Sequence, residues 1–145
     1  MQVVIQRVDK AEVTVNNEKS ESIDQGLVVL VGFEKTDNEN NVEKAAQKIM
    51  ALRIFEDDAG KMNRAITDIN GALLVVPNFT LAADCNKGNR PSFDTSLPPR
   101  EAQILFERLI ATLKQSALTI VTGSFGATMK VSLTNNGPVT FTVRF

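Results

Sequence analysis

The sequence predicts one α/β domain over residues 1–145, built from a curled, barrel-like β-sheet and two main helices. About seven or eight short apolar or alternating runs are typical of strands, and two longer segments carry the spacing of amphipathic helices. Because strands outnumber helices, a large sheet that curls toward a barrel is favoured. A chain of 145 residues is long enough to bury one core, and its length is that of a single domain.

Three strands and one helix are predicted in the first part of the chain. Val3–Val8 and Ala11–Val15 have strand-like patterns, with a turn near Asp9-Lys10 between them. Leu27–Val31 is a continuous apolar run between two glycines, typical of a strand buried on both faces. A helix follows, because apolar residues recur at helical spacing after three possible N-cap residues. The apolar positions are Val42, Ala45, Ala46, Ile49 and Met50, and the possible caps are Thr36, Asp37 and Asn38.

The rest of the chain predicts a second helix among further strands. Leu52–Phe55 and Ala72–Val76 are predicted strands, and Gly60–Asn63 is predicted as a turn or loop between them. Pro98-Pro99 opens the clearest helix, since proline fits the first helical position. Its apolar stripe consists of Ala102, Leu105, Phe106, Leu109, Ile110 and Leu113. The last strands are predicted at Thr119–Thr122, Met129–Leu133 and Val139–Phe145.

The composition excludes several classes of function. The chain has no histidine and one cysteine, which excludes Ser-His-Asp and Cys-His nucleophile schemes. Its 16 basic and 17 acidic residues nearly balance, which argues against strong non-specific binding to nucleic acid. We expect a soluble, cytoplasmic protein, because no run approaches the roughly 20 apolar residues of a membrane span and no basic signal peptide opens the chain.

The segment Asn135–Thr140 is the most informative in the chain. Glycine reaches positive φ angles readily, and the cis form of an X-Pro bond costs only about 0.5–1 kcal/mol. Gly137-Pro138 can therefore present two carbonyl oxygens in a fixed orientation, as a rigid gauge of substrate shape. The alternative is a plain turn between two strands.

A second candidate site lies where the predicted strand Ala72–Val76 ends. The backbone amides of Asn78, Phe79 and Thr80 leave this strand together and can converge on a developing oxyanion. Thr80 also offers a hydroxyl, as a nucleophile or as a hydrogen-bonding group that positions the substrate. The sequence contains no histidine to deprotonate this hydroxyl, and threonine is common at strand ends for reasons of propensity alone.

Other candidates each have an ordinary structural alternative. Arg7 lies among apolar strand residues, so its N–H groups need acceptors, either the carbonyls of a strained turn or a carboxylate at the surface. Phe125 and Met129 can line an apolar pocket or pack in the core. Cys85 is predicted to be an inert loop cysteine. We expect no metal and no cofactor, since the acidic residues lack the order of a calcium loop. These acidic residues are Glu34, Asp37, Glu39, Glu56, Asp57 and Asp58.

Seven segments, in order along essentially the whole chain, form a recognisable pattern. They are Val4–Val8, Gly26–Gly32, Leu52–Phe55, Gly60–Asn63, Lys87–Phe93, Phe125–Met129 and, most specific of all, Asn135-x-Gly137-Pro138-x-Thr140. In this combination the chain resembles the D-aminoacyl-tRNA deacylases. The resemblance implies hydrolysis of the ester bond of D-aminoacyl-tRNA, and also of glycyl-tRNA mischarged on tRNA-Ala, with release of the amino acid and free tRNA. It further implies little help from side chains, the 2′-hydroxyl of the RNA assisting.

The resemblance also implies a homodimer and a role for each site residue. The Gly-cis-Pro of one subunit, Gly137-Pro138, reaches into the other subunit's site and rejects an L side chain by steric clash. Arg7 supports this filter, the Phe79 amide faces the scissile carbonyl, and Thr80 lies beside it with Asn78. The resemblance assigns Phe125 and Met129 to the adenosine pocket. It assigns Lys87 and Arg90 to contacts with tRNA phosphates. The expected partner is the 3′ end of aminoacyl-tRNA, with no membrane and no DNA.

The chain departs from the family pattern at one place. Pro77-Asn78-Phe79-Thr80-Leu81 stands where the family usually has Ser-Gln-Phe-Thr-Leu. A proline at this position resembles a more permissive branch that edits L-alanine with a trans Gly-Pro, whereas Asn135 and Arg7 follow the D-specific pattern. Two alternatives remain: an RNA- or protein-binding module that keeps the fold with lost or reduced catalysis, and an acyl hydrolase that depends on Thr80.

Overall fold

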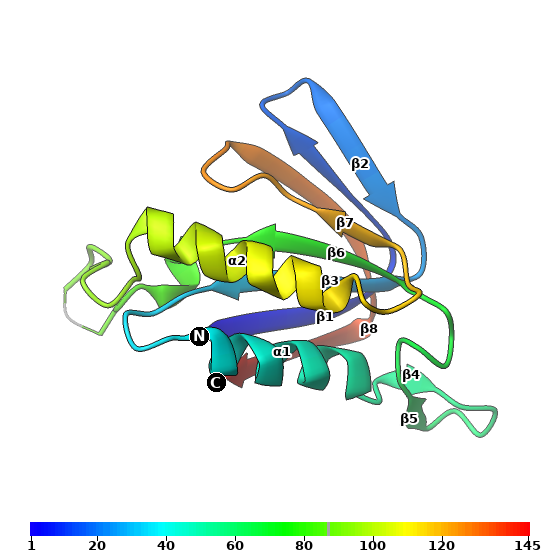
Figure 1. Ribbon diagram of the computed structural model, residues 1–145. Helices are drawn as coiled ribbons and strands as arrows, with labels where there is room; N and C mark the ends of the chain where they lie inside the picture. Colours follow the sequence, from blue (N-terminus) through cyan, green and yellow to red (C-terminus); the bar gives the residue numbers. More distant parts are fainter. Residues whose placement is uncertain (87) are drawn as a thin grey trace.

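The computed structural model describes residues 1–86 and 88–145, which contain eight strands and two α-helices (Figure 1). The helices are α1 (Glu39–Ala51) and α2 (Pro99–Leu113), and η1 (Phe79–Ala82) is a short 3₁₀ helix. The strands are β1 (Gln2–Val15), β2 (Lys19–Ile23), β3 (Gly26–Gly32), β4 (Phe55–Glu56), β5 (Met62–Arg64), β6 (Ala72–Pro77), β7 (Ile120–Thr122) and β8 (Met129–Arg144).

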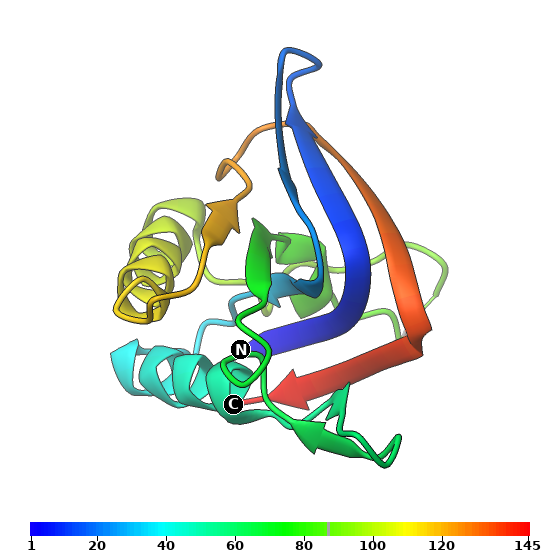
Figure 2. The ribbon, with the colours of Figure 1, turned by 90° about the vertical axis from the view of Figure 1, so that its right-hand side faces the viewer.

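One curled sheet organises the molecule. Its strands follow the order β2-β1-β3-β6-β7, and β8 pairs with β1. β1 pairs antiparallel with β2, β3 and β8, whereas β3 pairs parallel with β6 and β6 pairs parallel with β7. Figure 2 shows the long strands β1 and β8 curving together, with both helices on one side of the sheet. The predicted fold class is therefore confirmed.

Two apolar clusters fill the two sides of this sheet. The larger lies between the sheet and the helices, where α1 and α2 bury the residues that helical spacing predicted, among them Ile49 and Leu109. The smaller cluster joins Val8, Val13 and Leu74 on the opposite side. Burial on both sides explains why β3 and β6 read as continuous apolar runs.

Two local predictions in the first half of the chain are wrong. No turn separates Val3–Val8 from Ala11–Val15, because β1 runs through Asp9 and Lys10 with shifts in its register against β8. The predicted strand Leu52–Phe55 is reduced to Phe55 in the two-residue β4, and Met62 of the predicted turn lies in β5. In both places the pairing with other strands decides where a strand begins and ends, and the local sequence pattern does not contain this information.

The predicted separation of Met129–Leu133 from Val139–Phe145 is also wrong, because both lie in the single strand β8. Both halves pair with β1, so the segment between them is a bulge inside a paired strand. Gln6 pairs with Thr140 and Val8 pairs with Asn135. Residues 136–139 of β8 therefore lie opposite the single residue Arg7 of β1. The alternative of a plain turn does not describe this segment.

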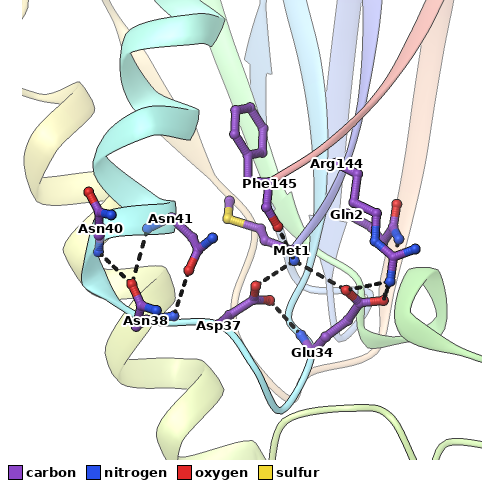
Figure 3. Close-up of polar contacts among 9 residues, drawn as sticks. All are labelled: Met1, Gln2, Glu34, Asp37, Asn38, Asn40, Asn41, Arg144 and Phe145. Carbon is purple, nitrogen blue, oxygen red and sulfur yellow. Dashed lines mark hydrogen bonds and ion pairs between the residues drawn. The ribbon is translucent and has the colours of Figure 1, made fainter.

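The two ends of the chain meet at the start of α1 (Figure 3). The Met1 ammonium contacts Asp37 Oδ1 at 2.5 Å and Glu34 Oε2 at 3.3 Å, and it donates to the Phe145 carbonyl at 3.2 Å. Asn38 caps α1, as predicted, by accepting from the N–H groups of the first turn. Burial raises the pKa of Glu34, but hydrogen bonds from Gln2 and Arg144 and the nearby ammonium charge outweigh it and hold the pKa below its usual value.

Candidate functional site

The loop that follows β6 determines which amides can reach a substrate. The Asn78 N–H donates to the Val31 carbonyl at 2.7 Å, and the Thr80 N–H donates to Asn78 Oδ1 at 3.2 Å. Among the residues that the structure describes, the Phe79 N–H has no acceptor. Of the three amides considered in the sequence, Phe79 alone keeps a donor available for a ligand.

A close approach of two backbones holds this loop in place. A Cβ atom on Gly32, at the end of β3, would lie 2.8 Å from both the Asn78 carbonyl oxygen and Leu81 Cβ. Only glycine allows η1 to pack this closely on β3. The first residue of η1 is Phe79, so this contact also sets the position of its N–H group.

Phe79 stands between two neighbouring cavities, of 550 Å³ and 410 Å³, which share Pro77, Phe79 and Gly126. The Phe79 ring is 61% exposed and lies with its centroid 5.1 Å from that of Phe93. The larger cavity is also lined by Gln6, Leu30, Val76, Asn78, Ala127, Met129, Val131 and Leu133. The smaller is also lined by Phe93, Ser96, Leu97, Pro98, Pro99, Ala102 and Phe125.

Phe125 and Met129, predicted to line one pocket, therefore line adjacent cavities. Both are only partly buried, and they pack against different core clusters. Phe125 also lies 6.2 Å from Phe106 between ring centroids. Each of the two residues thus lines a cavity and also packs against core residues, so both alternatives considered from the sequence are present.

The Thr80 hydroxyl donates to Asn78 Oδ1 at 2.5 Å. Asn78 thus holds both the hydroxyl and the backbone N–H of Thr80, as a cap of η1. A carboxamide oxygen is a poor base, and the sequence has no histidine, so nothing beside Thr80 activates it as a nucleophile. Its geometry is that of a group that stabilises the loop.

Arg7 is buried, with 6% of its surface exposed, and its guanidinium is directed at the bulge of β8. Nε donates to the Asn136 carbonyl at 3.1 Å, and Nη1 donates to the Ile54 carbonyl at 2.8 Å. Glu56 adds a longer contact at 3.4 Å. Both acceptor types considered in the sequence are therefore present, and the carbonyls are the closer.

The Gly137-Pro138 pair projects from the bulge and is exposed. The peptide bond between the two residues is cis, and Gly137 has a φ of +134°, in the region that favours glycine. Asn135 holds the far side of the bulge, because its Oδ1 accepts from the Val139 N–H at 2.8 Å.

The two predicted parts of the site lie on opposite faces of β1. Gln6 lines the 550 Å³ cavity beside Phe79, whereas Arg7 lines a separate cavity of 420 Å³ together with Asn136. Neither Gly137 nor Pro138 lines either cavity beside Phe79. One copy of the described chain does not bring the Gly-Pro pair and the Phe79 amide into one cavity.

Of the two residues predicted to contact tRNA, the structure describes one. Arg90 is exposed in a loop closed by the bridge between Asp84 and Ser92, and it lines neither cavity beside Phe79. Lys87 lies outside the described residues. Cys85 is exposed, and the described part of the chain contains no group of acidic, cysteine or histidine residues suited to a metal ion. Within the same residues, no helix is long and apolar enough to cross a membrane.

Sequence reasoning missed several residues that shape the site. Phe93 and Pro98 were placed in a loop and at a helix start, yet they line the smaller cavity with Phe79. An available signal was the aromatic residue at the end of a polar, glycine-containing loop. Asn136 was passed over because the motif Asn135-x-Gly137-Pro138-x-Thr140 leaves this position unspecified.

Comparison with known proteins gives consistent matches over the whole fold. The family model described as D-Tyr-tRNA(Tyr) deacylase matches residues 4–144. Proteins named D-aminoacyl-tRNA deacylase from Francisella tularensis subsp. tularensis and Saccharophagus degradans are each 50% identical over 141 residues, covering 97% of both chains.

Two solved structures are also similar. One titled c-Myc DNA Unwinding Element Binding Protein is 36% identical with a TM-score of 0.94, covering 100% of this chain and 99% of the other. A probable eukaryotic D-amino acid tRNA deacylase, 16% identical, has a TM-score of 0.84 over 98% and 97% of the two chains, and shows the fold alone. The predicted enzyme class is confirmed at the level of the family. The chain belongs to the D-Tyr-tRNA(Tyr) deacylase family.

Proposed function

We propose that this protein hydrolyses the ester bond between a D-amino acid and the 3′ adenosine of a tRNA. Membership of the family and the names of its relatives support this substrate class. The observation that carries the proposal is the Phe79 N–H, which has no acceptor in the described chain and belongs to a residue that lines both cavities. An ester carbonyl is an acceptor of the kind such a donor requires.

The two cavities divide the substrate between them. The adenosine lies against Phe125 and Met129, and the exposed rings of Phe79 and Phe93 offer faces on which a base can stack. The ester carbonyl then reaches the Phe79 amide. Lys87 and Arg90 contact phosphates further along the tRNA.

The chemistry needs little from side chains. A water molecule attacks the carbonyl carbon, the bond to the ribose oxygen breaks, and that oxygen takes a proton, so that amino acid and tRNA leave. The Phe79 N–H donates to the carbonyl oxygen as it gains negative charge. The ribose 2′-hydroxyl assists the water, while Asn78 and Thr80 hold the loop.

Stereochemical selection is assigned to a second copy of the chain. In a homodimer, the partner's Gly-Pro carbonyls would face the aminoacyl group, where an L side chain clashes and a D side chain or glycine fits. The separation of Gly137-Pro138 from the Phe79 cavities within one copy supports this arrangement. Exposed Val131, Leu133 and Phe141 on β8, which pairs with β1, supply an apolar surface for the partner.

The charge of the chain favours the end of a tRNA over DNA as the ligand. A net charge of −1 provides no excess of cations to follow a long duplex, whereas a single 3′ end needs only a local contact. We place this activity in the cytoplasm, with charged tRNA. Glycyl-tRNA mischarged on tRNA-Ala is a further proposed substrate, because glycine has no side chain to reject.

The test is hydrolysis of D-tyrosyl-tRNA and L-tyrosyl-tRNA at substoichiometric protein, with glycyl-tRNA-Ala as a third substrate. We expect turnover of the D-ester and of glycyl-tRNA, retained in Thr80→Ala and lost in Gly137→Val. A covalent ester and complete loss in Thr80→Ala would support the acyl hydrolase instead. Saturable binding without turnover of any ester would support the binding module.

A further inference from the structure

Asn136, the residue before the Gly-Pro pair, uses both ends of its side chain. Its Oδ1 accepts from Arg7 Nη2 at 3.1 Å, and its Nδ2 donates to Asp9 Oδ1 at 2.6 Å. Its main-chain carbonyl also accepts from Arg7 Nε at 3.1 Å. Asn136 is therefore fixed at three atoms between a buried arginine and an exposed aspartate.

The positions of these partners on β1 explain the arrangement. Arg7 and Asp9 are two residues apart on one strand, and the side chains of both reach the side chain of Asn136. The bulge of β8 places Asn136 opposite them. Between a donor and an acceptor, the carboxamide has the matching acceptor and donor. An aspartate here would pair with Arg7 but would face the carboxylate of Asp9 at hydrogen-bond distance.

The contacts of Asn136 with Arg7 and Asp9 fix the peptide that leads into Gly137. The carbonyl held by Arg7 belongs to the peptide bond that joins Asn136 to Gly137, so this contact fixes the peptide plane that ends at the Gly137 Cα atom. On the far side, Asn135 holds the Val139 N–H at 2.8 Å. The exposed Gly-Pro pair is thus held by side chains at both ends.

We propose that Asn136 and Asp9 form a positioning pair that sets the orientation of the Gly137 and Pro138 carbonyls, and with it the discrimination between D- and L-esters. The inference rests on the proposed function for the meaning of that orientation. The contacts themselves do not depend on it. Neither residue touches the substrate; both act through the Gly-Pro segment.

The test is a double-mutant cycle between Asn136→Asp and Asp9→Asn. Asn136→Asp sets two carboxylates against each other, and we expect kcat for D-tyrosyl-tRNA to fall about tenfold, as for loss of one hydrogen bond to a charged group. Adding Asp9→Asn restores a donor opposite an acceptor with the roles exchanged, so the double variant should regain most of the activity. Asn40→Asp, a matched change on the exposed surface of α1, controls for the added charge.

Two readouts separate positioning from a general loss of stability. In Asn136→Asp the ratio of D- to L-ester hydrolysis should fall and the Gly137 amide resonance should shift, while the double variant restores both. An unchanged ratio and resonance, or a double variant as impaired as the single one, would overturn the proposal. If the wild-type protein hydrolyses neither ester, the proposed function fails, and the Gly137 resonance across the cycle still decides the positioning role.

Discussion

At the scale of single residues, Gly137 has little freedom to change, because both its backbone angle and its neighbours disfavour a side chain. Its φ is +134°, and a Cβ atom would lie 2.5 Å from Val139 Cγ2 and 2.8 Å from the Val139 backbone nitrogen. The first contact could be relieved by a side-chain movement, but the second involves backbone. Val139 is itself buried in the larger core cluster, so displacement of the bulge extends into the core.

We therefore expect Gly137→Ala to lower the free energy of unfolding by about 1–3 kcal/mol, the cost of a strained backbone position. Hydrolysis of the D-ester should fall by a larger factor than this loss of stability predicts, because the folded bulge itself is displaced. Urea unfolding and kcat, measured on the same preparation, check this. Gly60→Ala is the matched control, since Gly60 also has a positive φ, of +73°, but nothing lies within 4 Å of its Cβ position. Equal effects of the two changes on kcat would contradict the assignment.

Only those features of the site that follow from the chemistry of individual residue types could be predicted from the sequence. The absence of histidine already indicated that any reaction would depend on backbone, hydroxyls or the substrate itself, and the need of Arg7 for acceptors followed from its apolar neighbours. That the Asn78 and Thr80 amides are occupied could not be predicted. The first depends on Val31, from a strand distant in sequence, and the second on the rotamer of a capping side chain.

At the scale of elements, η1 sets the position of the Phe79 N–H group. Phe79 is the first residue of this 3₁₀ helix and follows Asn78, which has an extended conformation with φ of −143° and ψ of 90°. Proline is tolerated at the first position of a helix and prefers an extended residue before it. A proline at position 79 can thus remove the N–H group with little disturbance of the backbone.

Phe79→Pro should accordingly lower kcat by about 10²–10³-fold, the size expected for loss of one oxyanion donor. Phe79→Ala is the matched control, because it removes the ring but keeps the N–H group, and its effect should appear mainly in KM for the tRNA. Steady-state kinetics with D-tyrosyl-tRNA separates the two. If alanine and proline lower kcat alike, the ring and not the amide is the important group.

The elements that were predicted correctly are those whose position depends on interactions between residues close together in the sequence. Both helices were found because capping and spacing lie within their own sequence, as Asn38 and Pro99 illustrate. The long strand β8 was divided in two because Gly137-Pro138 has the signature of a turn. Its pairing with β1 on both sides of the bulge is a property of the sheet.

At the scale of the whole molecule, the network around Met1 joins both ends of the chain to the start of α1 (Figure 3). Because the pKa of Glu34 is lowered in the folded state, its carboxylate adds stability above the usual value of 4.5, and this contribution disappears as the pH falls through the lowered pKa. We expect Glu34→Gln to reduce the loss of stability below pH 4.5 relative to the unchanged protein. Urea unfolding as a function of pH measures this, with the exposed Glu18→Gln as control. Identical pH profiles for the two variants would contradict a stabilising role for Glu34.

The assembly proposed for the active site makes a prediction that one subunit cannot fulfil. If Phe79 of one copy works with the Gly-Pro pair of the other, Phe79→Pro and Gly137→Val inactivate both sites of their own dimers. A mixed dimer has one site with both changes and one site with neither. Random exchange of the two variants should restore about a quarter of wild-type activity, since half the dimers are mixed and each has one intact site.

The control is a mixture in which both changes are in the same chain and the other chain is unchanged. There each site of a mixed dimer carries one change, and mixed dimers should be inactive. Activity is measured after exchange at a denaturant concentration that separates subunits, with the dimer confirmed by light scattering. If each subunit used its own Gly-Pro pair, the two separate variants would show no rescue on mixing, and the mixed dimers of the control would keep one active site. The opposite pattern in the two mixtures therefore distinguishes action across the interface from action within one chain.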